Sequence, residues 1–210
     1  MGETARRERR VDRTRNRLLD AAQALFLERG YDATPLGDVT ERADLGTGTL
    51  YLHFRDKRAL YEAVARRAVL SMWSTWIERA RGIDDPAEQI RSMIRVAIEF
   101  FAEDRRRAVL FLEQGPALES FLVEDISAGM GRVLSGRVAV PSMAANLVIG
   151  AALAAGRWWL KAPRGADTEA LIRTTVNFCG SGIAALQTTT KSETKSDGAR
   201  PRRRNRAKTH

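Results

Sequence analysis

Three short segments near the N-terminus have the apolar spacing of α-helices, and together they constrain the fold more than any other feature. The first, residues 12–29, carries its large apolar side chains on one face and is followed by Gly30, which can end a helix in the left-handed conformation. The second, residues 35–43, begins with Pro35, which fits the first position of a helix because no amide donor is needed there. Thr34 precedes this segment and is predicted to cap it.

The third segment begins at Gly46 and places Leu50 and Phe54 where both can return to the core. Asp44 and Leu45 form the turn before it. Three helices of this length, with a turn of about three or four residues between the last two, describe a helix-turn-helix. In such a motif the N-terminal end of the last helix enters the major groove of DNA, where short polar side chains reach the base edges.

The rest of the chain also shows helical periodicity. Asp56 is placed to cap a much longer helix, which the stretch from Gly82 to Pro86 ends. Further helical patterns cover residues 86–104, 106–115, 117–136, 141–162 and 167–187. The sequence therefore predicts an all-α protein, in which a three-helix helix-turn-helix domain is joined by a long helix to an all-helical domain. We expect a basic flexible arm over residues 1–11, the helix-turn-helix over 12–55, the helical body over 56–187 and a disordered basic tail over 188–210.

The formal net charge of +9 is concentrated at the two ends of the chain. Residues 1–17 hold seven Arg against three acidic side chains, and residues 188–210 hold eight basic against two acidic side chains. Basic ends on a nearly neutral body favour contact with a polyanion such as DNA, because neutralised phosphates release counterions. The stretch from Arg6 to Arg17 can act as an arm in the minor groove or be a solvated, mobile end. The same alternatives apply to the C-terminal tail, as a nonspecific phosphate anchor or a solvated end.

Several other functions are disfavoured by residues that the chain lacks. Cys179 is the only cysteine and His53 and His210 are the only histidines, so a Cys/His metal site lacks ligands. No nucleophile elbow, phosphate-binding loop or dinucleotide fingerprint occurs, so we expect neither an enzyme nor a cofactor. The single thiol and the charged N-terminus favour the cytoplasm over secretion. Residues 138–156 lack charge, but their alanine-rich composition favours a buried helix over a membrane span.

Residues 14–64 resemble the N-terminal domain of the TetR family of bacterial transcriptional regulators. The resemblance lies in the motifs LDAAxxLFxERGYxAT (residues 19–34) and GTLYxHF (residues 48–54), and in Lys57 at the start of the fourth helix. The chain departs from the family at the turn, where Asp44 replaces the usual Gly. It also departs at the start of the third helix, where Gly46 and Thr47 replace Ser and a larger polar residue, and at Gly37, where a basic residue is common.

The resemblance, together with the residue types at the start of the third helix, implies a set of DNA contacts. They are Thr34, Thr47, Gly48, Thr49, Tyr51, His53 and Lys57. Gly48 would let the backbone approach the DNA closely, and His53 and Lys57 would hold phosphates. For Tyr51 and His53 the alternative is half-buried packing with a satisfied polar tip.

By position, the last two helices resemble the pair through which this family forms homodimers. The run GAALAAG in residues 150–156 allows helices to approach closely, although an internal core remains the alternative. The aromatic residues and a few polar groups between helices four and eight predict a ligand pocket. Its predicted residues are Trp73, Trp76, Phe100, Phe111, Glu113, Gln114, Asn146 and Trp158.

The function that these features favour is a homodimeric repressor that binds double-stranded DNA at an inverted-repeat operator. A small, largely apolar effector would release it, and activation in place of repression stays open. The alternative is a nonspecific or architectural DNA-binding protein that relies on its basic ends. Protection of one short inverted repeat would exclude that alternative, whereas uniform and steeply salt-dependent binding would support it.

Overall fold

The computed structural model describes residues 2–113, 126–163 and 165–197. Its labelled helices are α1 (Gly2–Arg29), α2 (Leu36–Arg42), α3 (Thr47–His53), α4 (Lys57–Ala80), α5 (Pro86–Ala102), α6 (Arg105–Leu112), α8 (Pro141–Lys161) and α9 (Thr168–Asp197). Residues 126–134 are helical as well. No strand occurs within the described ranges, and the prediction of an all-α fold is confirmed.

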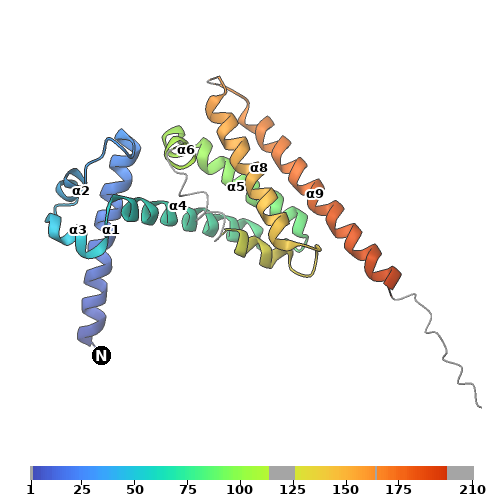
Figure 1. Ribbon diagram of the computed structural model, residues 1–210, viewed down its shortest axis with the longest axis horizontal. Helices are drawn as coiled ribbons and strands as arrows, with labels where there is room; N and C mark the ends of the chain where they lie inside the picture. The colour runs from blue at the N-terminus through green and yellow to red at the C-terminus, as the bar shows by residue number, and fades with distance from the viewer. Residues whose placement is uncertain (1, 114–125, 164, 198–210) are drawn as a thin grey trace, which may run out of the picture.

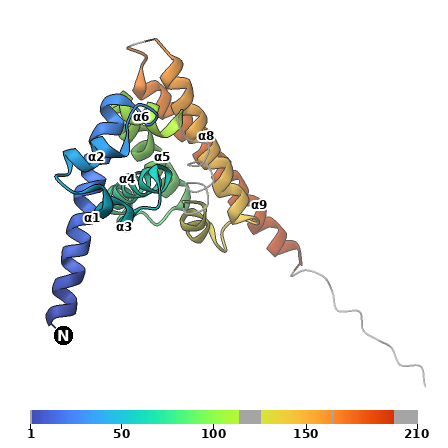
Figure 2. The same cartoon turned by 60° about the vertical axis from the view of Figure 1, so that its left-hand side comes forward.

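The helices form a small N-terminal lobe and a larger body (Figure 1). α1, α2 and α3 make the lobe, and α4 leads from it into the body of α5, α6, α8 and α9. α4 packs on α1 at one end and on α5 further along, while α9 packs along α5 and α8. α8 and α9 lie side by side along the body in both views (Figure 2).

Local sequence signals mark the ends of α1 and α4 and the start of α4 as the sequence predicts. Gly30 and Gly82 follow α1 and α4 with φ of 86° and 83°, the left-handed conformation that glycine adopts without a steric penalty. Asp44 has φ of 49° in the turn before α3, a conformation that Asp tolerates better than most side chains. The Asp56 carboxylate accepts a hydrogen bond of 2.7 Å from the amide of Ala59, so the predicted cap of α4 is confirmed.

Two predictions of unstructured ends are wrong for the described residues. Residues 2–11, expected to be a flexible arm, continue α1, and residues 188–197, expected to be disordered, continue α9. Neither extension contains Pro, and the only Gly is Gly2 at the first position of α1, so no helix breaker interrupts the backbone there. Extending a helix that is already packed costs less than nucleating a new one, which favours continuation. Residues 198–210 lie outside the described residues.

One continuous hydrophobic core joins the lobe to the body. It includes Leu18 of α1, Leu60 of α4, Ile90 of α5 and Ile172 of α9, each at most 3% exposed. The two parts therefore share apolar contacts across α4. A displacement of one part shifts the other, because packed interiors deform little.

Tyr61 stands at the junction of the lobe and the body. Its ring centroid lies 5.7 Å from that of Phe26, 4.9 Å from that of Tyr31 and 6.5 Å from that of Phe111. Its hydroxyl donates a hydrogen bond of 2.6 Å to the carbonyl of Leu110 in α6. Burial raises the pKa of Tyr61, so the phenol stays protonated and remains a donor.

Replacing Tyr61 with Phe removes this donor and keeps the ring. We expect the free energy of unfolding to fall by about 1–2 kcal/mol, because a buried carbonyl loses its partner. Urea denaturation followed by circular dichroism measures the change. Tyr51→Phe is the control, since Tyr51 is 55% exposed and should leave stability unchanged. Equal stability of Tyr61→Phe and the wild type would show that the bond contributes nothing.

Candidate nucleic-acid interface and internal cavity

α3 is held against the lobe by one face and leaves the other face open. Leu50 is fully buried and Phe54 is 4% exposed, and these two side chains anchor the helix. Thr47 and Gly48 are exposed, and Tyr51 is 55% exposed. Thr49 is half-buried beside them. The short polar side chains at the start of α3 thus lie on the side that a DNA groove could reach.

Leu52 is a surface residue of α3 that the sequence reasoning missed. It is 85% exposed, the most exposed large hydrophobic side chain in the described part of the chain. It follows Gly48 and Thr49 by four and three residues, so the three share one helical face. The signal was present in the sequence, because a residue two positions after the buried Leu50 must face away from the core. An apolar side chain there can contact a thymine methyl group.

Arg17 of α1 holds the turn that precedes α3. Its Nη2 donates hydrogen bonds to the carbonyl of Ala43, at 2.5 Å, and to that of Asp44, at 3.2 Å. These carbonyls lie directly after α2, where the end of a helix leaves acceptors without an internal partner. Arg17 ends the stretch for which a minor-groove arm and a solvated end were the two alternatives, and it has neither role here, because it makes a structural contact inside the helix-turn-helix.

Thr34 was predicted to cap α2 and to contact DNA, and the structure contradicts both. Its side chain is fully buried, and its hydroxyl donates to the carbonyl of Gly30 at 2.7 Å. The residue that caps α2 is Pro35, without a side-chain hydrogen bond. The hydroxyl donates to a carbonyl at the C-terminal end of α1, because the tight turn after Gly30 brings Thr34 back onto that helix.

His53 and Lys57, the predicted phosphate contacts, lie where α3 ends and α4 begins. His53 is half-buried, with its ring centroid 6.4 Å from that of Phe54. The Lys57 ammonium lies 4.6 Å from the centroid of the Tyr31 ring and donates to the carbonyl of Asp32 at 3.1 Å. An ammonium has three donors, so this bond leaves capacity for a phosphate.

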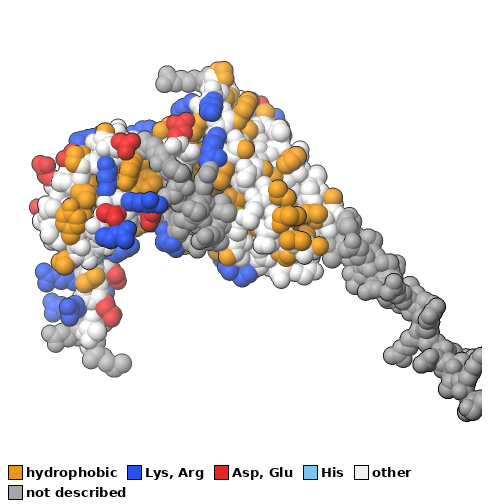
Figure 3. Space-filling view, in the orientation of Figure 1, with side chains coloured by type: hydrophobic (Ala, Val, Ile, Leu, Met, Phe, Trp, Pro, Cys, Tyr) orange, Lys and Arg blue, Asp and Glu red, His pale blue; other side chains and the backbone are white. Residues whose placement is uncertain are grey.

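The N-terminal end of α1 projects beyond α3 (Figures 1 and 2). It carries a basic stripe in the sequence. Arg6, Arg10 and Arg13 precede Arg17 by eleven, seven and four residues, which places all four on one helical face. Because Arg17 touches the turn before α3, that face lies on the side of the recognition helix. Lys and Arg side chains lie along one side of the projecting end, and Asp and Glu side chains along the other (Figure 3).

The body contains a cavity of about 70 Å³ between α4, α5, α6 and α8. Every residue that lines it is apolar or aromatic. Four of the predicted pocket residues, Trp73, Trp76, Phe100 and Phe111, contribute to this lining. Small side chains such as Ala68 and Ala152 leave the space open. The prediction named aromatic and polar residues and did not include these alanines.

The other predicted pocket residues that the structure describes, Glu113, Asn146 and Trp158, do not line this cavity. Glu113 is exposed, and Asn146 is exposed and accepts a hydrogen bond of 2.5 Å from Ser127. Trp158 is 59% exposed, and Gln114 lies outside the described residues. Asn146 faces outward because Ala144, Ala145, Val148 and Ile149 fill the inner face of α8. In the described part of the chain no three His, Cys, Asp or Glu side chains cluster as metal ligands would.

α8 and α9 expose large apolar side chains on the outside of the body. Met143 and Leu147 of α8 are 54% and 63% exposed, and Phe178 of α9 is 74% exposed. Hydrophobic side chains gather on this side of the space-filling view (Figure 3). α8 is also long and apolar enough to cross a membrane by length and composition alone, with a third of its most apolar window buried in the fold. Core helices of soluble proteins meet the same criterion.

The family model that describes bacterial regulatory proteins of the tetR family matches residues 18–64. The transcriptional activator FasR of Mycolicibacterium smegmatis is 25% identical over 189 residues, which cover 85% of this chain and 86% of FasR. The transcriptional repressor BepR of Brucella suis is 32% identical over 99 residues, so that match spans about half of either protein.

A solved structure shows the same likeness over most of the chain. The crystal structure of RolR in complex with its ligand resorcinol has a TM-score of 0.66 and 26% identity, and the match covers 92% of this chain and 97% of RolR. The helix-turn-helix with an exposed α3, the helical body behind it and these likenesses agree. The match to residues 18–64 identifies a DNA-binding domain of the TetR family, and the likenesses over the rest of the chain support a DNA-binding transcription regulator of this family.

Proposed function

We propose that the protein is a homodimeric repressor that binds an inverted-repeat operator and is released by a small, largely apolar effector. The observation that carries this proposal is that one continuous core joins the lobe that bears α3 to a body with an apolar cavity. An effector that prefers one shape of the body shifts the population of dimers whose recognition helices fit two successive grooves. Residues 12–55 are the DNA-binding unit, residues 56–187 bind the effector and dimerise, and the protein works in the cytoplasm.

Repression is the simpler outcome because a DNA-bound dimer blocks access of RNA polymerase. FasR is named an activator and BepR a repressor, so the sign of regulation differs between relatives. RolR, which resembles this chain in structure, binds the small aromatic ligand resorcinol, and this supports a small, largely apolar effector here. A reporter gene placed behind the selected operator tests the sign directly, since repression lowers and activation raises its expression.

Selection from random duplex DNA at near-physiological salt should enrich one inverted repeat. We expect Thr49→Ala and Tyr51→Ala each to weaken binding to that repeat by about 1–3 kcal/mol, the usual cost of a lost base-reading contact. Thr75→Ala is the matched control, because its hydroxyl bonds to Ser71 within α4, away from α3. Uniform binding to all sequences, with no enriched repeat, would favour the architectural alternative.

The exposed apolar face of α8 and α9 should form the dimer contact. Leu147→Glu or Phe178→Glu places a charge in that contact, so we expect the solution mass to fall to the 23.4 kDa of one chain. Operator affinity should fall with it, since one recognition helix reads only half the repeat. Leu70→Glu is the matched control, because Leu70 of α4 is 62% exposed and lies outside this face. Light scattering after gel filtration measures the mass, and an unchanged dimer would exclude this face.

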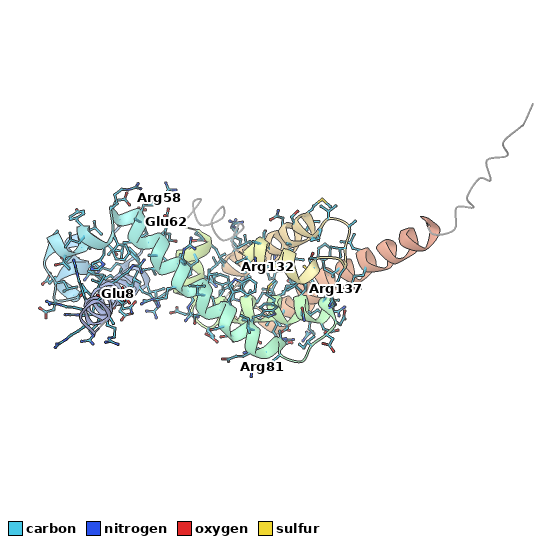
Figure 4. The ribbon with its side chains drawn as sticks, turned by 90° about the horizontal axis from the view of Figure 1, so that it is seen from below. Glu8, Arg58, Glu62, Arg81, Arg132 and Arg137 are labelled. Carbon is cyan, nitrogen blue, oxygen red and sulfur yellow. The ribbon has the colours of Figure 1, made fainter. Side chains whose placement is uncertain are left out.

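The basic stripe on the projecting end of α1 should contact operator phosphates. Replacing Arg6 and Arg10 with Gln should reduce the slope of log affinity against log salt by about 0.9 for each lost phosphate contact. Arg81 and Arg132 lie on the body, far from the Glu8 end of α1 (Figure 4), and their replacement by Gln is the charge-matched control. An unchanged slope for the Arg6 and Arg10 double variant would assign these side chains to solvent.

A further inference from the structure

A polar groove of about 390 Å³ lies beside the apolar cavity, where α1, α4, α5 and α6 meet. Its polar side chains are Asp20 and Gln23 of α1, Arg67 and Ser71 of α4, and Arg107 of α6. Ala68, Phe100 and Phe111 line both the groove and the cavity. These three side chains therefore form a thin wall between a polar space open to solvent and an apolar space inside the body.

Arg107 covers this wall from the polar side. Its guanidinium carbon lies 4.3 Å from the centroid of the Phe100 ring, and its Nη1 donates to the Phe100 carbonyl at 2.7 Å. The same nitrogen lies 3.2 Å from the carboxylate of Glu103. The Arg107 side chain is 25% exposed, so it is largely desolvated and still open to a solute. A guanidinium has five N–H donors, and these contacts use only one of its nitrogens.

Arg67 stands on the other side of the groove and ties α4 to α1. Its Nη1 donates to Asp20 at 2.6 Å and its Nη2 donates to Gln23 at 2.8 Å. The Arg67 side chain is 33% exposed, and that of Asp20 is 70% exposed. These contacts of Arg67 hold α1, which belongs to the DNA-binding lobe, against α4, which leads into the body.

From this juxtaposition we propose that the effector is an amphiphilic carboxylate. Its apolar tail enters the cavity past Phe100, and its carboxylate lies in the groove between Arg107 and Arg67. Arg67 pairs with Asp20 and Arg107 with Glu103, but the contacts of Arg107 use only one of its nitrogens. Its remaining donors can pair with a ligand carboxylate, because planar guanidiniums bind carboxylates through two parallel hydrogen bonds. This proposal rests on the proposed function, because it names the chemical class of the effector.

The position of the carboxylate also gives a route from the effector to DNA. A bound carboxylate competes with Asp20 for Arg67 and so weakens the contact between α1 and α4. The lobe that bears α3 then has more freedom relative to the body, which favours dimers that no longer match the operator. Such a ligand shifts the equilibrium only to the extent that it binds the released form more tightly.

Octanoate and 1-octanol share one tail and differ in the charged head, and they are the probes. The fluorescence of Trp73 and Trp76, which line the cavity, reports binding to the full-length protein. We expect octanoate to bind at least about tenfold more tightly than 1-octanol, the difference that hydrogen bonds to a charged group provide. Octanoate should also displace the selected operator at concentrations near its dissociation constant.

Variants then separate the head site from the tail site. Arg107→Gln should weaken the binding of octanoate by about tenfold and leave the binding of 1-octanol unchanged. Arg106→Gln is the control, because Arg106 lies on the same helix outside the groove. Asp20→Asn should instead strengthen octanoate, because Arg67 loses its competing carboxylate. Ala152→Phe fills the cavity and should weaken both probes.

Equal binding of both probes, with no effect of Arg107→Gln, would overturn the carboxylate proposal. If 1-octanol also displaces the operator in that case, the apolar effector of the proposed function still stands. If neither probe binds while the operator is bound and the dimer is intact, the carboxylate proposal fails, and the effector part of the proposed function loses the cavity as its site. If Arg107→Gln weakens the binding of octanoate and of 1-octanol by the same factor, the Arg107 side chain contributes to packing alone.

Discussion

The contact on which the rest of the structure depends is the aromatic junction around Tyr61. Through it α1 and the loop after α1, from the N-terminal lobe, pack against α6 of the body, and one hydrogen bond from the Tyr61 hydroxyl to the Leu110 carbonyl fixes the register of that packing. Apolar burial holds the two parts together without direction, whereas this bond requires one geometry. Phe111 belongs to the junction and also lines the cavity, so the space inside the body borders the contact that positions the lobe.

The surfaces left open by this arrangement are consistent with two different partners. α3 exposes short polar side chains and Leu52, which suits the edges and methyl groups of bases. α8 and α9 expose Met143, Leu147 and Phe178, and burying such a face against a second copy removes apolar surface from water. The surface suited to DNA therefore lies on the lobe and the apolar surface suited to a second copy lies on the body, and α4 connects the lobe to the body.

Arginine has several distinct roles in this protein, and the structure separates them. Arg17 satisfies backbone carbonyls in the turn before α3, and Arg67 joins α1 to α4. Arg6 and Arg10 have neither role in their exposed positions on the projecting end of α1. A count of basic residues in the first seventeen positions treats all of them as one polyanion-binding arm, and only their contacts distinguish a clamp from a surface charge.

The sequence by itself determined the all-helical fold, the presence of the helix-turn-helix and the cap that begins α4, but not the full lengths of α1 and α9 or the cap of α2. Period-3.6 apolar spacing, Gly30, Asp44 and Asp56 are local signals, and local signals act within a few residues. The tertiary structure alone decided which side chains face outward or share a space. It buried Thr34 against α1, turned Asn146 and Trp158 outward, and brought Arg67 and Arg107, forty residues apart in the sequence, to one groove. Such placements depend on how helices pack across long sequence separations, and a periodic pattern gives the face of each helix without naming the neighbour that covers it.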